Sequence, residues 1–319
     1  MHRSWSFALL LASCLLAACS PSEDDSSAED SADAGEAPSN AVTSVLAPTS
    51  FVATAGCTSA WLTWAAPTMP TGTTLTGYSV QQATTTAGPW TNVANCPQTS
   101  TAANCAALAL TGGSTYSFRV AAITKTGTVS STGPYSSTAT PAAIHTIGTT
   151  CENRDLGPGG GKLYKNNSFA CGPTLSSTCT FLEIGPSLGS MAWCQKLNKV
   201  TGAVGTNVGT GASNTAAMLA IGCTSGAGFA ANAYRGGGFS DWYLPSEIEV
   251  FIANNLIFQY KNVSTEIKPV TWSSTTWWTS TQTSNFNSTA STVKIDSAVL
   301  VNSALGKASS AEVHPVRAF

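Results

Sequence analysis

Short runs in which apolar and polar residues alternate dominate the first large segment of the chain, residues 46–142. Such runs occur at 59–64, 76–80 and 115–121, and the residues between them are rich in Pro, Gly, Ser and Thr. A two-residue period places successive side chains on opposite faces of a strand, and short strands at regular spacing are typical of antiparallel sandwiches. We therefore predict an all-β sandwich over residues 46–142.

Residues 151–319 combine helical and strand-like patterns and follow a predicted linker at residues 143–150. Apolar residues at helical spacing predict three helices. They are expected around Met191–Asn198, after a cap formed by Ser213 and Asn214, and after Ser246. Strands are expected at 162–164 and from Val270 onward, so the segment is predicted to form one α+β domain.

Two local motifs refine this picture. Ser246 and Glu249 have the spacing of a capping box, in which each side chain bonds the backbone N–H of the other residue at a helix start. The glycine-rich run 157–161 lacks both the Lys-Ser/Thr ending of a phosphate-binding loop and the pattern of a dinucleotide-binding turn. We expect it to form a tight turn into the strand at 162–164 instead of a phosphate site.

The first 45 residues predict export and membrane anchoring. A short basic start and an apolar run lead to Leu16-Ala17-Ala18-Cys19, which resembles a bacterial lipoprotein signal; an ordinary cleaved signal peptide is the alternative. The resemblance implies a signal peptide at residues 1–18, lipidation of Cys19 and a membrane partner reached through the lipid. Residues 19–45 then form a disordered acidic tether, because they hold too little apolar surface to fold. Ser20 favours the outer membrane, on its periplasmic or its outer face.

The net charge of −2 hides an uneven distribution. The tether contributes seven acidic residues, whereas residues 46–319 carry 13 basic and 9 acidic residues. The resulting excess of positive charge is spread along the chain, while nucleic-acid binding requires a clustered basic stripe. We therefore expect no nucleic-acid partner, although a weak preference for anionic glycans is compatible with the count. Residues 46–142 contain no Asp or Glu, which excludes carboxylate catalysis there.

The cysteines predict structural disulfides. Eight remain after the signal sequence and Cys19 are set aside, no Cys-x-x-Cys motif occurs, and the histidines are too scattered to suggest a metal. We expect no metal and no cofactor. The short-loop pairings are Cys96 with Cys105, Cys171 with Cys179, and Cys194 with Cys223. Cys57 and Cys151 are left, and they either pair across the domain boundary or pair differently.

The sandwich segment resembles the fibronectin type III family. The resemblance rests on Leu62–Pro67, on Gly77-Tyr78 and on the run Leu110–Val120. It implies that Trp64 belongs to the core and that Tyr116 makes a corner hydrogen bond. A spacer role is favoured over direct binding, because this fold supports many functions.

The last domain resembles the C-terminal domain family of the Legionella collagen-like adhesin, Lcl, which looks related to C-type-lectin-like folds. Four blocks match in order: Ala192–Leu197, Gly238–Ser246, Thr271–Thr275 and Pro315–Phe319. The resemblance implies structural signature roles for Asp241, Trp242 and Arg317. It also implies binding of sulfated glycosaminoglycans through basic residues, but Tyr243 and His314 stand where the family usually has basic side chains.

Four residues are candidates for ligand contacts in this domain. Trp277 and Trp278 are adjacent, so in a strand they face opposite sides, and one of them is expected to be exposed for stacking on a sugar ring. Arg235 and Lys294 are candidates for contacts with anionic groups, although a solvated surface position is the alternative for each. Trp242 lies in a family block, and a core position is favoured for it.

No pattern in the sequence supports catalysis. Asp241 and Glu249 do not form an acid–base pair, and no Ser/His/Asp order has local motif support. We therefore expect a non-enzymatic envelope lipoprotein whose C-terminal domain binds a glycan or another extracellular ligand. The alternative is a structural or assembly protein that makes homo-oligomer contacts and has no free ligand.

Overall fold

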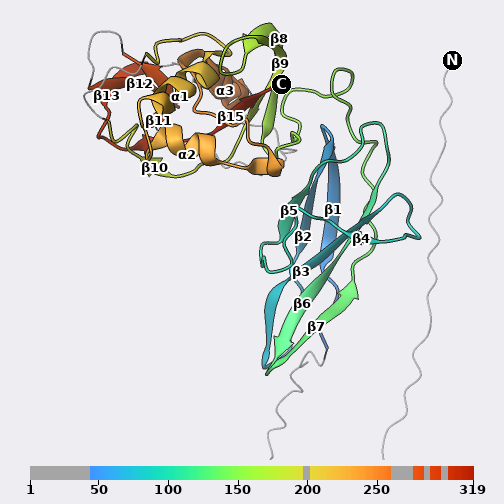
Figure 1. The fold of residues 1–319 in the computed structure, drawn as a ribbon. Helices are drawn as coiled ribbons and strands as arrows, with labels where there is room; N and C mark the ends of the chain where they lie inside the picture. The colour runs from blue at the N-terminus through green and yellow to red at the C-terminus, as the bar shows by residue number, and fades with distance from the viewer. Residues whose placement is uncertain (1–43, 197–201, 260–275, 284–287, 296–300) are drawn as a thin grey trace, which may run out of the picture. The chain divides into compact units, whose positions relative to one another are not determined.

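The computed structural model describes residues 44–196, 202–259, 276–283, 288–295 and 301–319. The predicted signal sequence, the Cys19 lipidation site and most of the acidic tether lie outside these residues, as does the block around Trp272. The described chain forms two sets of sheets, one within residues 49–135 and the other within residues 162–318 (Figure 1).

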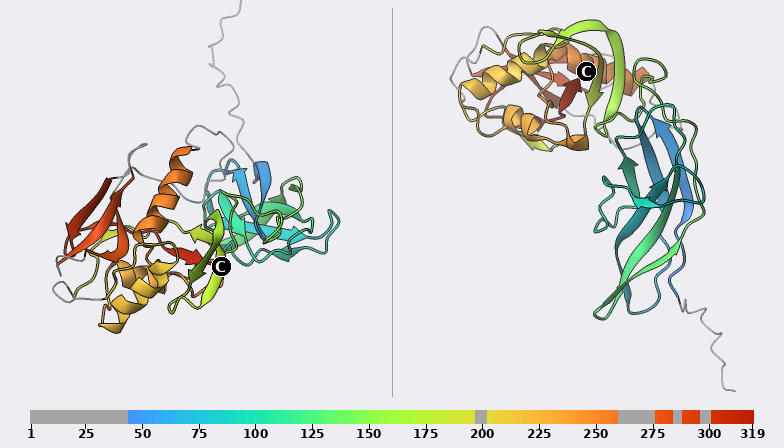
Figure 2. Two further views of the ribbon diagram at one scale, coloured as in Figure 1. Left: turned by 90° about the horizontal axis from the view of Figure 1, so that it is seen from above. Right: turned by 45° about the vertical axis from the view of Figure 1, so that its right-hand side comes forward.

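The N-terminal module is a sandwich of two antiparallel sheets (Figures 1 and 2). Three strands form one sheet in the order β1-β2-β5, and four form the other in the order β4-β3-β6-β7. The bounds are β1 Thr49–Gly56, β2 Ser59–Ala65, β3 Thr73–Ala83, β4 Thr91–Asn92, β5 Asn104–Ala107, β6 Ser117–Thr126 and β7 Val129–Tyr135. Alternate residues of both sheets meet in one apolar core. The predicted all-β sandwich is confirmed.

The two aromatic residues singled out in this module have the expected structural roles. Trp64 is 7% exposed, and its ring lies edge-on to Tyr78 with 5.0 Å between the ring centroids. The Tyr116 hydroxyl accepts a hydrogen bond of 3.2 Å from the backbone N–H of Thr111, five residues upstream. This bond fixes the corner that precedes β6, as in other sandwiches with a tyrosine corner.

The C-terminal segment contains two more sheets and three α-helices. The sheets have the orders β15-β9-β8 and β10-β14-β11-β12-β13. The strands are β8 Lys162–Cys171, β9 Ser177–Ile184, β10 Ser190–Met191, β11 Thr276–Gln282, β12 Thr289–Lys294, β13 Val301–Gly306, β14 Ala311–Glu312 and β15 Val316–Ala318. The helices are α1 Thr210–Ala220, α2 Ala227–Ala233, the 3-10 turn η1 Gly236–Gly238, and α3 Glu247–Gln259. Helices α1 and α3 pack against β11, and α3 also contacts β12 (Figure 1).

Two of the three predicted helices are present. Helix α3 begins after Ser246 with the predicted capping box, in which the Ser246 N–H donates to the Glu249 carboxylate at 2.7 Å. Helix α1 includes Ser213 and Asn214 but starts earlier, after Gly209, so the predicted cap position is wrong. No helix among the described residues is long and apolar enough to span a bilayer.

The predicted helix around Met191 is wrong over its described part. Ser190 and Met191 pair with β14, and residues 192–196 continue without regular structure. The apolar residues here serve tertiary contacts: Trp193 is fully buried, and its indole N–H donates to the Thr279 carbonyl at 2.7 Å. A disulfide fixes the next residue, Cys194. Tertiary packing therefore overrides a local helical spacing.

Candidate functional site

A buried arginine connects the last strand, β15, to Asp241 in the segment Gly238–Ser246 before α3. Arg317 is 5% exposed; its Nε and Nη2 donate to Asp241 at 2.9 and 3.0 Å, and its Nη1 donates to Glu183 at 3.1 Å. The guanidinium also stacks 3.8 Å from the ring centre of Phe239. Only a planar guanidinium can hold two carboxylates and stack at the same time. Asp241 and Arg317 thus make structural contacts, and Trp242 beside them is 1% exposed.

The glycine-rich run before β8 binds a carboxylate of the chain itself. The N–H groups of Gly159 and Gly161 both donate to Glu183 Oε1 at 2.8 Å. Glu183 is fully buried, and this desolvation raises the pKa of its carboxyl above the usual value despite the donors and the charge of Arg317. A side chain at Gly159 would collide with the Trp242 ring. The run is thus a tight turn, as predicted, but its role in holding Glu183 has no signal in the local sequence.

Both candidate stacking residues are buried, so the expectation of an exposed tryptophan here is wrong. Trp277 is 1% exposed and Trp278 is fully buried. They do face opposite sides of β11, but each side has its own apolar cluster: Trp277 packs with Val250 and Trp278 with Leu244. The burial of both rings, each in a different cluster, shows that both faces of β11 are covered. Neither ring can stack on a ligand without opening the core.

The candidate cationic residues lie on different elements. Arg235 is exposed after α2, and its guanidinium donates to the backbone carbonyls of Asn232 and Tyr234, each at 2.7 Å. Lys294 is exposed at the end of β12. Lys307 is fully buried over the Trp193 ring, and burial lowers its pKa to about 8. The structure therefore does not assemble the predicted cations around the two tryptophans.

The capping box of α3 contains a carboxyl with a strongly altered pKa. Glu249 is 1% exposed and accepts hydrogen bonds from the N–H groups of Gly209 and Ser246 at 2.8 and 2.7 Å, and from the Tyr243 hydroxyl at 3.2 Å. Burial is the dominant effect and raises the pKa of Glu249 from 4.5 to about 7. The folded chain therefore holds this proton more tightly than the unfolded chain.

A polar hollow of about 350 Å³ opens beside the five-stranded sheet. Its polar wall comes from α3, from β11 to β13 and from the segment before α1: Thr206, Glu247, Thr281, Gln282, Ser291 and Asn302. We call this site the polar hollow. Ligand pockets are typically hollows of at least about 300 Å³ with a few converging polar groups. Sequence patterns cannot identify the polar hollow, because its residues come from five separate parts of the chain.

Hydrogen bonds within the polar hollow hold its wall in place. The Ser291 hydroxyl lies 2.7 Å from Asn302 Oδ1 and 3.1 Å from Glu247 Oε2, and Asn302 Nδ2 donates to the other oxygen of Glu247. The Thr281 hydroxyl donates to the Gly205 carbonyl at 2.8 Å, which leaves its oxygen able to accept. The wall thus combines oriented donors and acceptors, and none of the described residues that line it is a lysine or an arginine.

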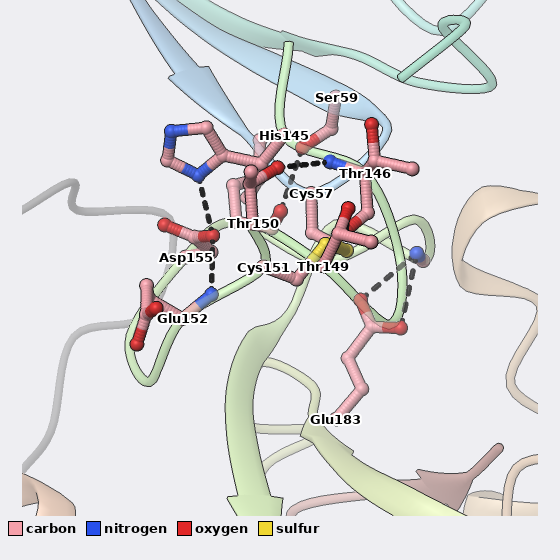
Figure 3. The surroundings of a disulfide bond; sticks show 12 residues. Cys57, Ser59, His145, Thr146, Thr149, Thr150, Cys151, Glu152, Asp155 and Glu183 are labelled. Carbon is pink, nitrogen blue, oxygen red and sulfur yellow. Dashed lines mark hydrogen bonds and ion pairs between the residues drawn. A yellow bond between two sulfur atoms is a disulfide. The ribbon is translucent and has the colours of Figure 1, made fainter. Parts of the chain in front are cut away.

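The segment between the modules is bonded to the end of β1 (Figure 3). Cys57 and Cys151 form a disulfide, so the pairing across the domain boundary is the correct alternative. The backbone N–H of Cys57 and the hydroxyl of Ser59 both donate to the Leu156 carbonyl, at 2.8 and 2.7 Å. His145 Nδ1 lies 2.7 Å from the Asp155 carboxylate. We call this set of contacts the joint.

The predicted linker is part of the joint. Ile144 is 1% exposed and belongs to the sandwich core, and His145 pairs in parallel with Cys57. The other three disulfides also have the predicted partners: Cys96–Cys105, Cys171–Cys179 and Cys194–Cys223. Within the described residues, no group of three or more His, Cys, Asp or Glu side chains could hold a metal ion.

Comparisons with known proteins give the class of the first module. Residues 46–138 match the family model of the fibronectin type III domain, in agreement with the sandwich and the tyrosine corner. The N-terminal module is therefore a fibronectin type III domain, a kind of module that serves in binding or as a structural unit. No curated protein shows a significant match to the chain.

Similar solved structures cover about a third of the chain. An Fn3-like protein from Clostridium thermocellum is 23% identical over 31% of this chain and 93% of its own, with a TM-score of 0.25. A structure described as a myokine is 18% identical over 31% of this chain and 97% of its own, also with a TM-score of 0.25. Titin domains A168–A170 are 26% identical over 31% of this chain and 32% of their own, with a TM-score of 0.24.

Proposed function

We propose that this chain is a non-enzymatic lipoprotein of the outer membrane whose C-terminal unit binds an extracellular ligand, a glycan in the first instance. The polar hollow supports this proposal most directly, because it offers a ligand-sized site in the unit farthest along the chain from the lipidated Cys19. The fibronectin type III domain and the acidic tether act as spacers between membrane and binding site. In this proposal the C-terminal unit is a relative of the Lcl C-terminal domain, with a C-type-lectin-like α+β fold.

A binding assay on the lipid-free chain tests the ligand. The chain from Ser20 to Phe319 is displayed in many copies on a bead, so that weak contacts add up, and is applied to an array of neutral and sulfated glycans. Binding to at least one glycan group is the expected result. A wholly negative array, with a known lectin positive on the same slide, would refute glycan binding.

The anchoring claim has its own test. Metabolic labelling with a fatty-acid analogue is expected to mark the wild-type chain and to be abolished by Cys19→Ala, because the thiol of Cys19 is the acceptor in this proposal. Protease added to intact cells then separates the two faces of the outer membrane. Unchanged labelling of the Cys19→Ala chain would contradict lipidation at this residue.

One structural feature favours an assembly role as the second candidate. Strand β13, Val301–Gly306, is the edge of the five-stranded sheet and among the described strands pairs only with β12. An edge strand can pair with another chain through its backbone groups. Light scattering on the lipid-free chain distinguishes the roles, because an assembly protein is expected to form oligomers and a monomer would argue against it.

A further inference from the structure

We infer that the polar hollow binds an uncharged, hydroxyl-rich ligand of about the size of one hexose residue of a glycan. This inference rests on the proposed ligand-binding function and specifies its site and its ligand class. It differs from the anionic, sulfated ligands that the sequence resemblance implies.

The chemistry of the wall favours hydroxyl groups. Glu247 supplies acceptor oxygens, Asn302 supplies both a donor and an acceptor, and Ser291 and Thr281 supply hydroxyls. A sugar hydroxyl donates and accepts at once, so it can bond a carboxylate and an amide at the same time. The internal bonds of Ser291 and Asn302 hold these groups in place before a ligand arrives, which lowers the entropy cost of binding.

The charges of the wall disfavour a sulfated ligand. Among the residues that the structure describes around the polar hollow, Glu247 is the one ionisable side chain, and its charge repels an anion placed beside it. Behind the wall, the Lys307 ammonium donates to Gln282 Oε1 at 2.7 Å, and Lys307 itself is fully buried. The lysine therefore fixes the orientation of the Gln282 amide and cannot reach a sulfate in the hollow.

The size of the hollow sets the expected affinity. A volume of about 350 Å³ is at the lower end for ligand sites, which fits one monosaccharide rather than an extended chain. A hexose has about a dozen non-hydrogen atoms, and at the usual efficiency of small polar ligands the dissociation constant is on the order of 1 mM. Binding to a surface that carries many copies of the glycan is correspondingly tighter.

The test is an NMR titration of the lipid-free chain from Ser20 to Phe319. The probes are a panel of neutral monosaccharides and methyl glycosides, with a heparin-derived disaccharide as the anionic probe and spermidine as the cationic probe. We expect saturable shifts of backbone amides in β12 and β13 with at least one neutral sugar. Heparin disaccharide and spermidine are expected to leave these amides unchanged at the same concentrations.

Three variants locate the binding site. Asn302→Ala removes an amide from the wall, and Glu247→Gln replaces one acceptor oxygen with an N–H donor; each is expected to weaken binding about tenfold. Ala304→Trp places a bulky ring in the hollow and is expected to abolish binding by a different physical effect. Arg235→Ala is the matched control on an exposed residue outside the wall and is expected to bind as the wild type does. Thermal melting confirms that each variant is folded.

The outcomes separate this inference from the function on which it rests. A neutral sugar that binds all the variants as tightly as the wild type overturns the site and leaves the binding function intact. Binding of heparin disaccharide or spermidine alone overturns the ligand class. If no glycan binds either here or on the array, the proposed glycan function fails, and this inference fails with it.

Discussion

The disulfide of the joint is expected to remove most of the fibronectin type III domain from the path of a pulling force. Cys57 lies at the start of the domain and Cys151 beyond its end, 94 positions later. Tension applied between the N-terminus and the C-terminal unit passes through the sulfur bridge, since this covalent route is far shorter than the intervening chain. Only β1 and the residues before it can then be pulled out of the sandwich.

The length of chain that the joint disulfide keeps from extending follows from the positions of the cysteines. An extended chain spans about 3.4 Å per residue, and the Cα atoms of Cys57 and Cys151 are 5.1 Å apart while the bridge is intact. The second disulfide, Cys96–Cys105, keeps the nine residue steps between its cysteines out of any extension. Breaking the joint disulfide alone should therefore release about 290 Å of additional chain when the domain unfolds.

Single-molecule force spectroscopy measures this length. The chain from Ser20 to Phe319 is held at its two ends and stretched in the oxidised form. The double variant Cys57→Ala/Cys151→Ala is expected to show an added extension of about 290 Å. The control variant Cys96→Ala/Cys105→Ala should add no extension, because both cysteines lie inside the loop that the intact joint disulfide closes. Equal total extension of the oxidised wild type and the Cys57/Cys151 variant would refute the force path proposed here.

Three further predictions concern the stability of the C-terminal unit. Arg317→Met should cost about 3 kcal/mol of unfolding free energy, because it leaves the buried carboxylate of Glu183 without its cation. In urea unfolding, adding Glu183→Gln to this variant should restore most of the loss. Additive losses from the two substitutions would contradict the pairing. The pKa of Glu249 is about 7 in the folded chain and 4.5 in the unfolded chain, so its contribution to stability is complete below pH 4.5. About 3 kcal/mol of that contribution is lost between pH 4.5 and 7. Urea unfolding at stepped pH should show that Glu249→Gln removes this dependence of the unfolding free energy on pH. Gly209→Ala should lower the melting temperature far more than Gly189→Ala, since both glycines have positive φ but only at Gly209 does a Cβ collide with a backbone carbonyl.

The elements that the sequence predicted well are those defined by local or pairwise rules. A two-residue period identifies the sandwich strands. The roles of Trp64 and Tyr116 follow from the resemblance to the fibronectin type III family, and the structure bears them out. The capping box fixes the start of α3, because Ser246 and Glu249 bond each other across a single turn. The three short disulfides follow from an even number of cysteines at short spacing.

The elements that the sequence missed depend on contacts between distant segments. The alternation rule correctly placed Trp277 and Trp278 on opposite faces of a strand, but it carries no information on what covers the second face. Trp193 gives its segment a helical spacing although the ring is anchored to β11 through the Thr279 carbonyl. Glu183 also depends on distant segments, because its partners are the glycine turn before β8 and the C-terminal Arg317.

The basic residues show how the contrast between local sequence rules and contacts between distant segments affects the predicted ligand. Counted along the sequence, the folded part of the chain has an excess of positive charge, which is compatible with anionic glycans. In the structure, however, Lys162, Lys307 and Arg317 are all buried, and Arg317 is bonded to two carboxylates. A buried cation cannot bind a surface sulfate without leaving its partners, at a cost of several kcal/mol. The charge count therefore overstates what the surface offers an anion, and the polar hollow with its single carboxylate makes a neutral ligand the better match.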